Sequence, residues 1–267
     1  MFGIAGDGCP SRFKLAGDHE LVTVVDVLRK RGPACAVPEL FMLGTDRCRV
    51  AVCVDETPPA VLIEPTAPKI TLAVHGRAGS IGVRQYLSEV EAGVGFIAPS
   101  ELEPVVTAMG RRPAVLPMPV LSTSHVRPAS HRAPPGNREP LGPQHEAAVD
   151  DLPAEGRGFL ECYHSVAEFL ADPLPGVASV VDDQIVSICV VYARFEGACE
   201  VAVYTRPEHR GHGHGTAVAV ECLRLVLNAR CRPVWTAVDD ASRRLGIKVG
   251  LTPVGEKLYV MFERPAA

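Results

Sequence analysis

The feature that most constrains the fold of this chain is a glycine-rich loop between an apolar strand and an amphipathic helix. Residues Cys199 to Thr205 read as a strand, and the loop Arg210-Gly211-His212-Gly213-His214-Gly215-Thr216 follows. The helix is expected from Thr216 to Ala229, and its core-facing residues are predicted to be Ala217, Val220, Cys222, Leu223 and Leu227. Because a helix start offers unpaired backbone N–H groups and a positive dipole end, this unit predicts an anion cradle.

The glycines suit such a cradle because they let the backbone approach an anion closely. We expect Gly213 and Gly215 to make that approach. Other phosphate loops fit less well, since no Gly-Lys-Ser/Thr follows the glycines and no acid about 20 residues further on completes a dinucleotide site. A purely structural glycine turn stays an alternative, because glycine loops precede many helices without any ligand.

The rest of the C-terminal half alternates short helices and strands. The expected helices are Glu146 to Leu152, Val166 to Leu170 and Ala241 to Val249. The expected strands are a hairpin, Ala178 to Val181 and Ile185 to Ala193, followed later by Pro233 to Val238 and Leu258 to Phe262. This half therefore predicts a mixed α/β domain.

Residues 122–143 are crowded with proline, serine, glycine and charge, without helical or strand period, which predicts a linker. The expected organisation is an N-terminal α+β domain at 1–121, this linker, and a C-terminal domain at 144–267. In the N-terminal domain we expect a helix at Glu20 to Arg31 after an Asp18 cap, strands at Arg49 to Val54, Val61 to Ile63 and Lys69 to His75, and a helix at Ile81 to Val90. The glycines between Gly76 and Gly82 are interpreted as a plain turn.

Charge and composition exclude several partners. The net charge of -4 supplies no positive field for nucleic acid or an anionic membrane. The longest apolar runs, such as Ile185 to Tyr192, have strand length, and the N-terminus shows no secretory signal, so we expect a cytoplasmic protein. The nine cysteines contain no Cys-x-x-Cys pair, which argues against a disulfide framework and a zinc site and favours buried thiols.

The run Arg210-x-x-Gly213-x-Gly215 resembles the Arg/Gln-x-x-Gly-x-Gly/Ala signature of the GNAT superfamily of N-acetyltransferases. The wider run EVAVYTRPEHRGHGHGTAVAVECL, followed by PVWTAVDDASRRLGIKVGL, resembles the consecutive core motifs of that family in order and spacing. The resemblance covers residues 138–262 and implies an α/β GNAT fold with a mixed, mostly antiparallel, splayed sheet. The order of an N-terminal unit followed by this C-terminal domain is also similar to a two-part bacterial subgroup of the family. In that case the N-terminal domain would be a degenerate copy of the same fold.

What the resemblance implies is transfer of an acetyl group from acetyl-CoA to a primary amine by direct attack in a ternary complex. The strand around Val203 and Thr205 would hold the pantetheine arm through backbone N–H groups. The loop residues Arg210, Gly211, His212, Gly213, His214, Gly215 and Thr216 would hold the pyrophosphate. Asp239 replaces the family's usual Asn in the second motif, and Ser242 would either contact the cofactor or cap its helix.

Two residues are the catalytic candidates. Glu200 is the candidate general base, with a solvated acid at a strand end as the alternative. Many family members carry a tyrosine as acid in the helix before the closing glycine, but Gly246 stands there, which leaves Tyr204, Tyr259 or solvent, of which we choose Tyr204. The missing tyrosine also favours a second hypothesis, a noncatalytic acyl-CoA-binding sensor or interaction module, and a longer acyl group is a third.

The remaining polar and aromatic features are interpreted as structural. His209, His212 and His214 are expected to be surface residues that add charge to the loop, and no metal is predicted. Cys222 and Trp235 are expected in the core. The N-terminal domain is expected to form a wall beside the substrate or a dimer contact, so a homodimer is among the assemblies considered.

Overall fold

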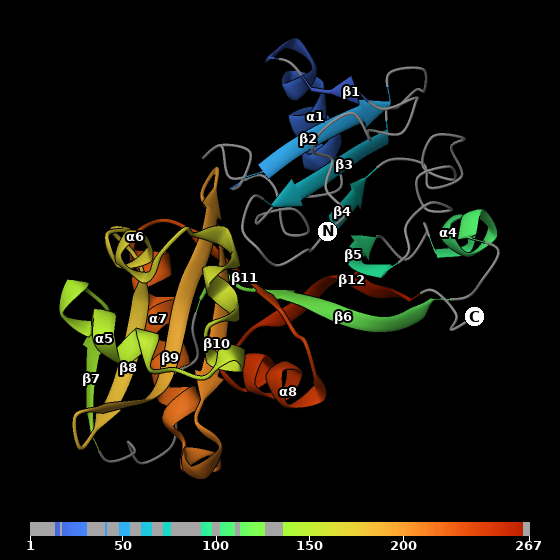
Figure 1. The fold of residues 1–267 in the computed structure, drawn as a ribbon. Coiled ribbons are helices and arrows are strands. Elements are labelled where there is room, and N and C mark those ends of the chain that lie inside the picture. Colours follow the sequence, from blue (N-terminus) through green and yellow to red (C-terminus); the bar gives the residue numbers. More distant parts are fainter. Residues whose placement is uncertain are drawn as a thin grey trace. The chain divides into compact units, whose positions relative to one another are not determined.

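In the computed structural model of this protein, residues 14–16, 18–30, 41, 48–53, 60–65, 72–75, 92–97, 102–109, 113–125 and 136–263 are described. The chain divides into two compact units (Figure 1). The first unit comprises Met1–Met118 and Glu256–Ala267, and the second comprises Pro119–Gly255. No helix in the described part of the chain combines the length and the apolar character needed to cross a bilayer.

The first unit contains a mixed sheet and the helices α1 (Asp18–Lys30) and α4 (Leu102–Met109). Its strand order is β1 (Lys14–Leu15), β2 (Cys48–Cys53), β3 (Ala60–Pro65), β4 (Leu72–His75), β5 (Ala92–Ile97) and β12 (Thr252–Glu263). Neighbouring strands are antiparallel, except for the parallel pair β4 and β5. This unit therefore combines helices with a mostly antiparallel sheet, in line with the expected α+β class.

The predicted helix at Glu20 to Arg31 and the three predicted strands are confirmed within one to three residues at most of their ends. Asp18 lies inside the helix rather than before it. Strand β5 and helix α4 were not predicted. The predicted turn at Gly76 to Gly82 and helix at Ile81 to Val90 lie outside the described residues.

The sheet of the second unit places its one parallel pair at the centre. Its strand order is β6 (Ala114–Ser122), β11 (Arg232–Thr236), β10 (Ala198–Thr205), β9 (Gln184–Phe195), β8 (Gly176–Val181) and β7 (Asn137–Pro140). Strands β10 and β11 are parallel, and all other neighbours are antiparallel. The expected mixed, mostly antiparallel sheet is confirmed.

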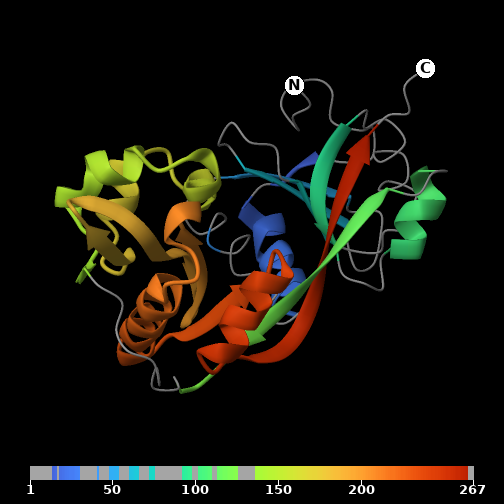
Figure 2. The same cartoon turned by 90° about the horizontal axis from the view of Figure 1, so that it is seen from below.

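Helices cover both faces of this sheet (Figure 2). Helix α7 (His214–Asn228) lies on one face, and the other carries α5 (Glu146–Asp150), α6 (Val166–Leu170) and the 3₁₀ turns η4 (Ala154–Gly156) and η5 (Gly158–Cys162). Helix α8 (Asp240–Lys248) follows β11. The helix and hairpin predictions for this half are confirmed, with ends shifted by a few residues.

Helix α7 anchors the main core of the unit through one apolar stripe. The stripe consists of Val218, Ala219, Cys222, Leu223 and Val226, all fully buried. Their spacing keeps them on one side of a 3.6-residue helix, and burying each large side chain stabilises the fold by about 1.5–3 kcal/mol. The predicted Val220, Cys222 and Leu223 are buried, whereas Ala217 and Leu227 are only half-buried.

The prediction of a structureless linker at 122–143 is corrected by strand β7 and by the last residue of β6, Ser122. Strand β7 comprises Asn137–Pro140 and pairs with β8, so the prediction that this segment contains no strand was wrong. Pro140 is tolerated because β7 is the edge of its sheet, where fewer N–H donors are required. Residues 126–135 lie outside the described part of the chain. The division into two domains stays a proposal, with residues 119–122 counted in the second unit.

Strand β6 was not predicted because Pro117 and Pro119 argue against a strand. In the sheet, Leu121 lies opposite Trp235 of β11. The carbonyl of Pro119 accepts a hydrogen bond from the backbone N–H of Ala237 at 2.8 Å. Proline can act as an acceptor here because only its donor is missing.

Candidate active site

The loop between β10 and α7 has an open backbone geometry. Gly211 (φ 80°) and Gly213 (φ 91°) both occupy the left-handed region, which favours glycine. A Cβ on either would meet no atom within 4 Å. Gly213 is the N-cap of α7, which begins at His214 rather than at the predicted Thr216.

The first turn of α7 offers backbone donors without competition. The first intrahelical bond runs from the N–H of Ala217 to the carbonyl of Gly213 at 3.0 Å, so the N–H groups of the preceding helical residues have no intrahelical acceptor. No side chain caps this end, and no acid lies in its first turn. The geometry is therefore suited to an anion.

Gly215 has a packing role beyond the one we expected. A Cβ on Gly215 would stand 3.0 Å from Oγ1 of Thr205 and 3.7 Å from Cγ1 of Val203. Its missing side chain therefore lets α7 approach β10 closely, and the expected approach of its backbone to an anion stays a prediction. Its backbone N–H still belongs to the first turn of the helix.

Strands β10 and β11 separate beside this loop. Their parallel pairing ends at Glu200 opposite Val234, and residues 201–205 of β10 have no partner on β11. The sheet is therefore splayed as expected, and an irregularity in the β9 register between Glu200 and Val201 marks the same point.

The backbone groups that face the splay can be identified from alternation. The carbonyl of Tyr204 accepts from Ser187 Oγ at 2.9 Å and the N–H of Arg206 donates to Val186, so both face β9. Since successive residues of a strand alternate, Val203 and Thr205 direct their N–H groups toward the side that β11 has left. The carbonyl of Thr205 on that side accepts from Arg210 Nε at 3.0 Å.

His214 is buried, with 2% of its surface exposed, so the expectation of a surface residue is wrong. Its Nδ1 lies 3.0 Å from Oγ of Ser179, and its ring meets that of His209 edge to face at 5.8 Å. Burial lowers the pKa of His214, and the nearby His209, His212 and Arg138 act in the same direction. His214 is therefore neutral at neutral pH and anchors the loop to β8.

Glu200 is fully buried, so the alternative of a solvated strand-end acid is wrong. Its Oε1 accepts hydrogen bonds from the backbone N–H of Thr236 at 3.0 Å and from Thr236 Oγ1 at 2.5 Å. The carboxylate thus bridges β10 and β11 where they separate. Thr236 itself is half-buried.

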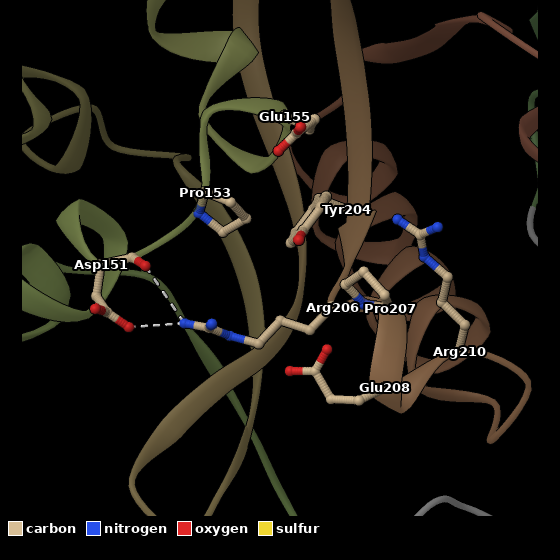
Figure 3. Close-up of a pocket in the computed structure, with 8 residues that line it drawn as sticks. All are labelled: Asp151, Pro153, Glu155, Tyr204, Arg206, Pro207, Glu208 and Arg210. Atoms are coloured by element: carbon tan, nitrogen blue, oxygen red, sulfur yellow. Dashed lines mark hydrogen bonds and ion pairs between the residues drawn. The ribbon is translucent and has the colours of Figure 1, made fainter.

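Tyr204 lines a pocket of about 580 Å³ (Figure 3). A Cβ on Gly156 of η4 would stand 2.9 Å from the tyrosine ring, so the ring packs directly against that turn. Burial raises the pKa of Tyr204, opposed by Arg210 and Arg206 and reinforced by Glu155 and Glu208. The hydroxyl therefore remains protonated at neutral pH and can donate a proton. The lining residues are Asp151, Pro153, Glu155, Tyr204, Arg206, Pro207, Glu208 and Arg210.

At the start of α8, Asp239 is the helix cap. Its Oδ1 accepts from the N–H of Ser242 at 2.6 Å, so the idea that Ser242 caps the helix is wrong. Ser242 Oγ accepts instead from Nε1 of Trp235 at 2.9 Å. Trp235 is 2% exposed and, like Cys222, belongs to the core as predicted.

Gly246 is buried against β6. A Cβ on it would stand 2.5 Å from Cδ1 of Leu121, which leaves no room for the family's tyrosine without displacing the core. The alternative acid Tyr259 lies on β12, opposite Phe96 of β5 in the first unit.

Sequence reasoning did not single out the pocket residues Glu155, Arg206 and Glu208, or Thr236. The position of Arg206 and Glu208 just before the glycine loop was the one available signal for the pocket. Nothing local marks Glu155 or Thr236, because each meets the site through a different element. Among the described residues, no group of three or more His, Cys, Asp or Glu side chains could hold a metal.

Residues 145–259 match the family model described as GNAT acetyltransferase. A GCN5-related N-acetyltransferase-like protein from Streptococcus suis has a similar fold, with a TM-score of 0.69, 17% identity, and coverage of 92% of this chain and 100% of that one. A GCN5-related N-acetyltransferase from Sphaerobacter thermophilus is also similar, with a TM-score of 0.59, 14% identity, and coverage of 97% of this chain and 98% of that one. A tandem GNAT protein from the clavulanic acid biosynthesis pathway has a TM-score of 0.59 and 16% identity, with coverage of 96% of this chain and 99% of that one.

No curated protein matches the sequence at a significant level. At identities this low, the similar structures establish the fold, and the family model adds the family. The C-terminal half of this chain, residues 145–259, therefore belongs to the GNAT acetyltransferase family and is an acyltransferase domain.

Proposed function

We propose that the protein transfers an acetyl group from acetyl-CoA to a primary amine by direct attack in a ternary complex. The observation that carries the proposal is the meeting of two backbone features at one place. The open start of α7 and the unpartnered edge of β10 both lie next to Arg210. Together they match an anionic group joined to an extended amide-containing arm.

The residues present fit acetyl-CoA. The pyrophosphate would lie on the N–H groups of His214, Gly215 and Thr216, with Arg210 and the exposed His212 beside it. The open space over Gly211 and Gly213 admits the phosphates. The pantetheine amides would pair with backbone groups of Val203 and Thr205 as an added strand does. When bound, acetyl-CoA supplies a thioester carbonyl open to attack by an amine.

The attacking amine must lose a proton, and Glu200 is the proposed base. Because Glu200 is fully buried, the half-buried Thr236 hydroxyl would take the proton from the amine while passing its own to Oε1 of Glu200. The relay would place one proton on the carboxylate for each turnover. The position of Glu200 where β10 and β11 separate supports this role.

The leaving thiolate must gain a proton, and Tyr204 is the proposed acid. Burial and the two nearby glutamates keep its hydroxyl protonated, so a proton is available at neutral pH. Asp239 and Ser242 stay proposed neighbours of the cofactor, although both already hold α8 and Trp235 in place.

The N-terminal unit is proposed to be a degenerate second copy of the fold, as the likeness to a tandem GNAT protein over 96% of this chain supports. A cytoplasmic location and a homodimer stay predictions. The second candidate function, an acyl-CoA sensor without turnover, is favoured by one observation. Gly246 stands where the family's usual tyrosine acid is expected, and Leu121 fills the space that a side chain there would need.

Calorimetric titration with acetyl-CoA, together with thiol release in the presence of primary amines, tests the proposal. Binding with thiol release supports the transferase, binding without release for any amine supports the sensor, and absence of binding contradicts both. Replacing Tyr204 by Phe is expected to lower kcat by about 10²-fold, while the matched Tyr259→Phe variant keeps it. Glu200→Gln is expected to lower kcat by about 10²-fold, because the carboxylate that accepts the proton from Thr236 is lost.

A further inference from the structure

The pocket beside Tyr204 lies on the face of β10 away from the glycine-loop helix. The side chains of Val203 and Thr205 approach Gly215 of α7. Since side chains alternate along a strand, Tyr204 points to the opposite face, where its ring packs on Gly156 of η4. The pocket of about 580 Å³ on this face falls in the size range of small-molecule sites.

Five charged side chains line this pocket, but three of them are already engaged (Figure 3). Arg206 Nη2 pairs with Asp151 Oδ2 at 2.8 Å, and Arg206 Nε donates to the carbonyl of Ile185 at 2.8 Å. Arg210 Nε donates to the carbonyl of Thr205 on the splayed edge, where the cofactor would lie. The first pair is neutral as a unit, and Arg210 is assigned to the cofactor side.

The other two charges are carboxylates on opposite approaches to Tyr204. Glu155 comes from η4 and Glu208 from the 3₁₀ turn η6 (Pro207–His209). Both are exposed, and neither forms a hydrogen bond or ion pair with another described residue. Both nevertheless act on the pKa of Tyr204, which places their field at its hydroxyl.

These charges decide what the pocket accepts. With Asp151 and Arg206 neutral as a pair, Glu155 and Glu208 outnumber Arg210, so the pocket carries a net negative charge that disfavours the phosphates of a CoA molecule and attracts a cation. A reacting amine must be neutral when it attacks, so it cannot keep an ion pair with both carboxylates during the reaction. A second positive group that does not react can keep one.

We propose that this pocket binds the acceptor, and that the acceptor is a small amine with a second cationic group, held by Glu155 and Glu208. The inference rests on the proposed acetyl transfer and deepens it by naming the substrate class. Tyr204 lies between the two carboxylates and serves both the acceptor side and the departing thiolate.

Three five-carbon amines of equal length provide the test. They are 1,5-diaminopentane, pentylamine and 5-aminopentanoate, which end in an ammonium, a methyl group and a carboxylate. With acetyl-CoA and the full-length protein, kcat/KM for the diamine is expected to exceed that for pentylamine about tenfold, as one charge-assisted hydrogen bond allows. The amino acid is expected to be the poorest acceptor.

Variants locate the effect. The double change Glu155→Gln and Glu208→Gln keeps shape and removes charge, and it is expected to abolish the preference for the diamine while leaving acetyl-CoA affinity unchanged. Asp150→Asn removes an exposed charge near the pocket that does not line it, and this control is expected to keep the preference.

The outcomes separate this inference from the proposed function. Thiol release with equal or reversed preference, or a preference that survives in the double variant, overturns the inference alone. A tenfold change in acetyl-CoA affinity in the double variant assigns the pocket to the cofactor and also overturns it. If no amine is turned over, calorimetry of 1,5-diaminopentane with the CoA-saturated protein decides. Binding that the double variant loses supports the pocket, and no binding overturns it.

Discussion

The two units of this chain repeat one strand order. In the first, β1 to β4 are antiparallel neighbours, β5 is parallel to β4, and β12 is antiparallel to β5. In the second, β7 to β10, then β11 and then β6 follow the same pattern. In both, the last strand comes from outside the run of the other five, since β6 precedes them in sequence and β12 follows them.

The units differ in the connection between their parallel strands. In the second unit, residues 206–231 contain Arg210-x-x-Gly213-x-Gly215 and α7. In the first, residues 76–91 are fewer and contain no Arg-x-x-Gly-x-Gly spacing. The comparison teaches that one strand order can be built with different connections, and that the loop to which we assign cofactor binding occurs in the second connection and not in the first. The predictions below test that difference.

The largest effect is expected where the second unit depends on β6. Leu121 is fully buried in its main core, so Leu121→Ala is expected to lower the free energy of unfolding by about 2–5 kcal/mol, from lost burial and the cavity left behind. Urea unfolding measures the change. Leu116→Ala on the same strand removes a side chain that is 40% exposed and should stay within about 0.5 kcal/mol. Equal losses of unfolding free energy in the two variants would contradict the argument from the burial of Leu121.

A second prediction concerns the contact of Gly246 with Leu121. Gly246→Ala adds a methyl group 2.5 Å from Leu121 Cδ1 and is expected to destabilise by about 1–3 kcal/mol, less about 1 kcal/mol of gained helix propensity. In the Leu121→Ala background the clash is absent, so the same change should stabilise. A double-mutant cycle with additive effects would contradict this account of Gly246.

A third prediction compares the two connections directly. Gly213→Ala forces alanine into φ 91°, at a cost of about 1–2 kcal/mol, and is expected to weaken acetyl-CoA binding about tenfold in calorimetry. Gly158→Ala, whose added methyl group would also meet no atom within 4 Å, should bind as the wild type does. Gly79→Ala tests the connection in the first unit and should also leave the affinity unchanged. Weaker binding in that variant would give the first unit a part in the site.

The smallest effect is expected from His214. Because its pKa is lowered in the folded protein, the unfolded chain binds the proton more tightly. The stability from neutral His214 is present above its ordinary pKa of 6.5 and is lost as the pH falls toward its folded value. Unfolding free energies at pH 7 and 5 should therefore differ less in His214→Gln than in the wild type. The exposed His164→Gln serves as control, and an unchanged slope in His214→Gln would contradict the argument.

Local pattern was enough to predict most elements of the second unit and the position of the loop. The alternation of β10, the period of α7 and the glycines between them lie within one stretch of chain, so their physics is readable there. The same reasoning missed β6 and β7, because prolines argue against strands unless the neighbouring strand does not need the missing donor. It also misjudged the exposure of Glu200 and His214, which depends on partners 36 and 35 residues away.

The sequence by itself determined the glycine loop, the strand and helix that flank it and the family these resemble, since backbone conformation and amphipathic period are set by neighbouring residues. Only the tertiary structure decided that Glu200 meets Thr236, that Leu121 fills the space beside Gly246, and that Glu155 joins Glu208 around Tyr204. Each of these is a contact between distant segments. Burial and charge pairing belong to such contacts, so no local pattern carries them.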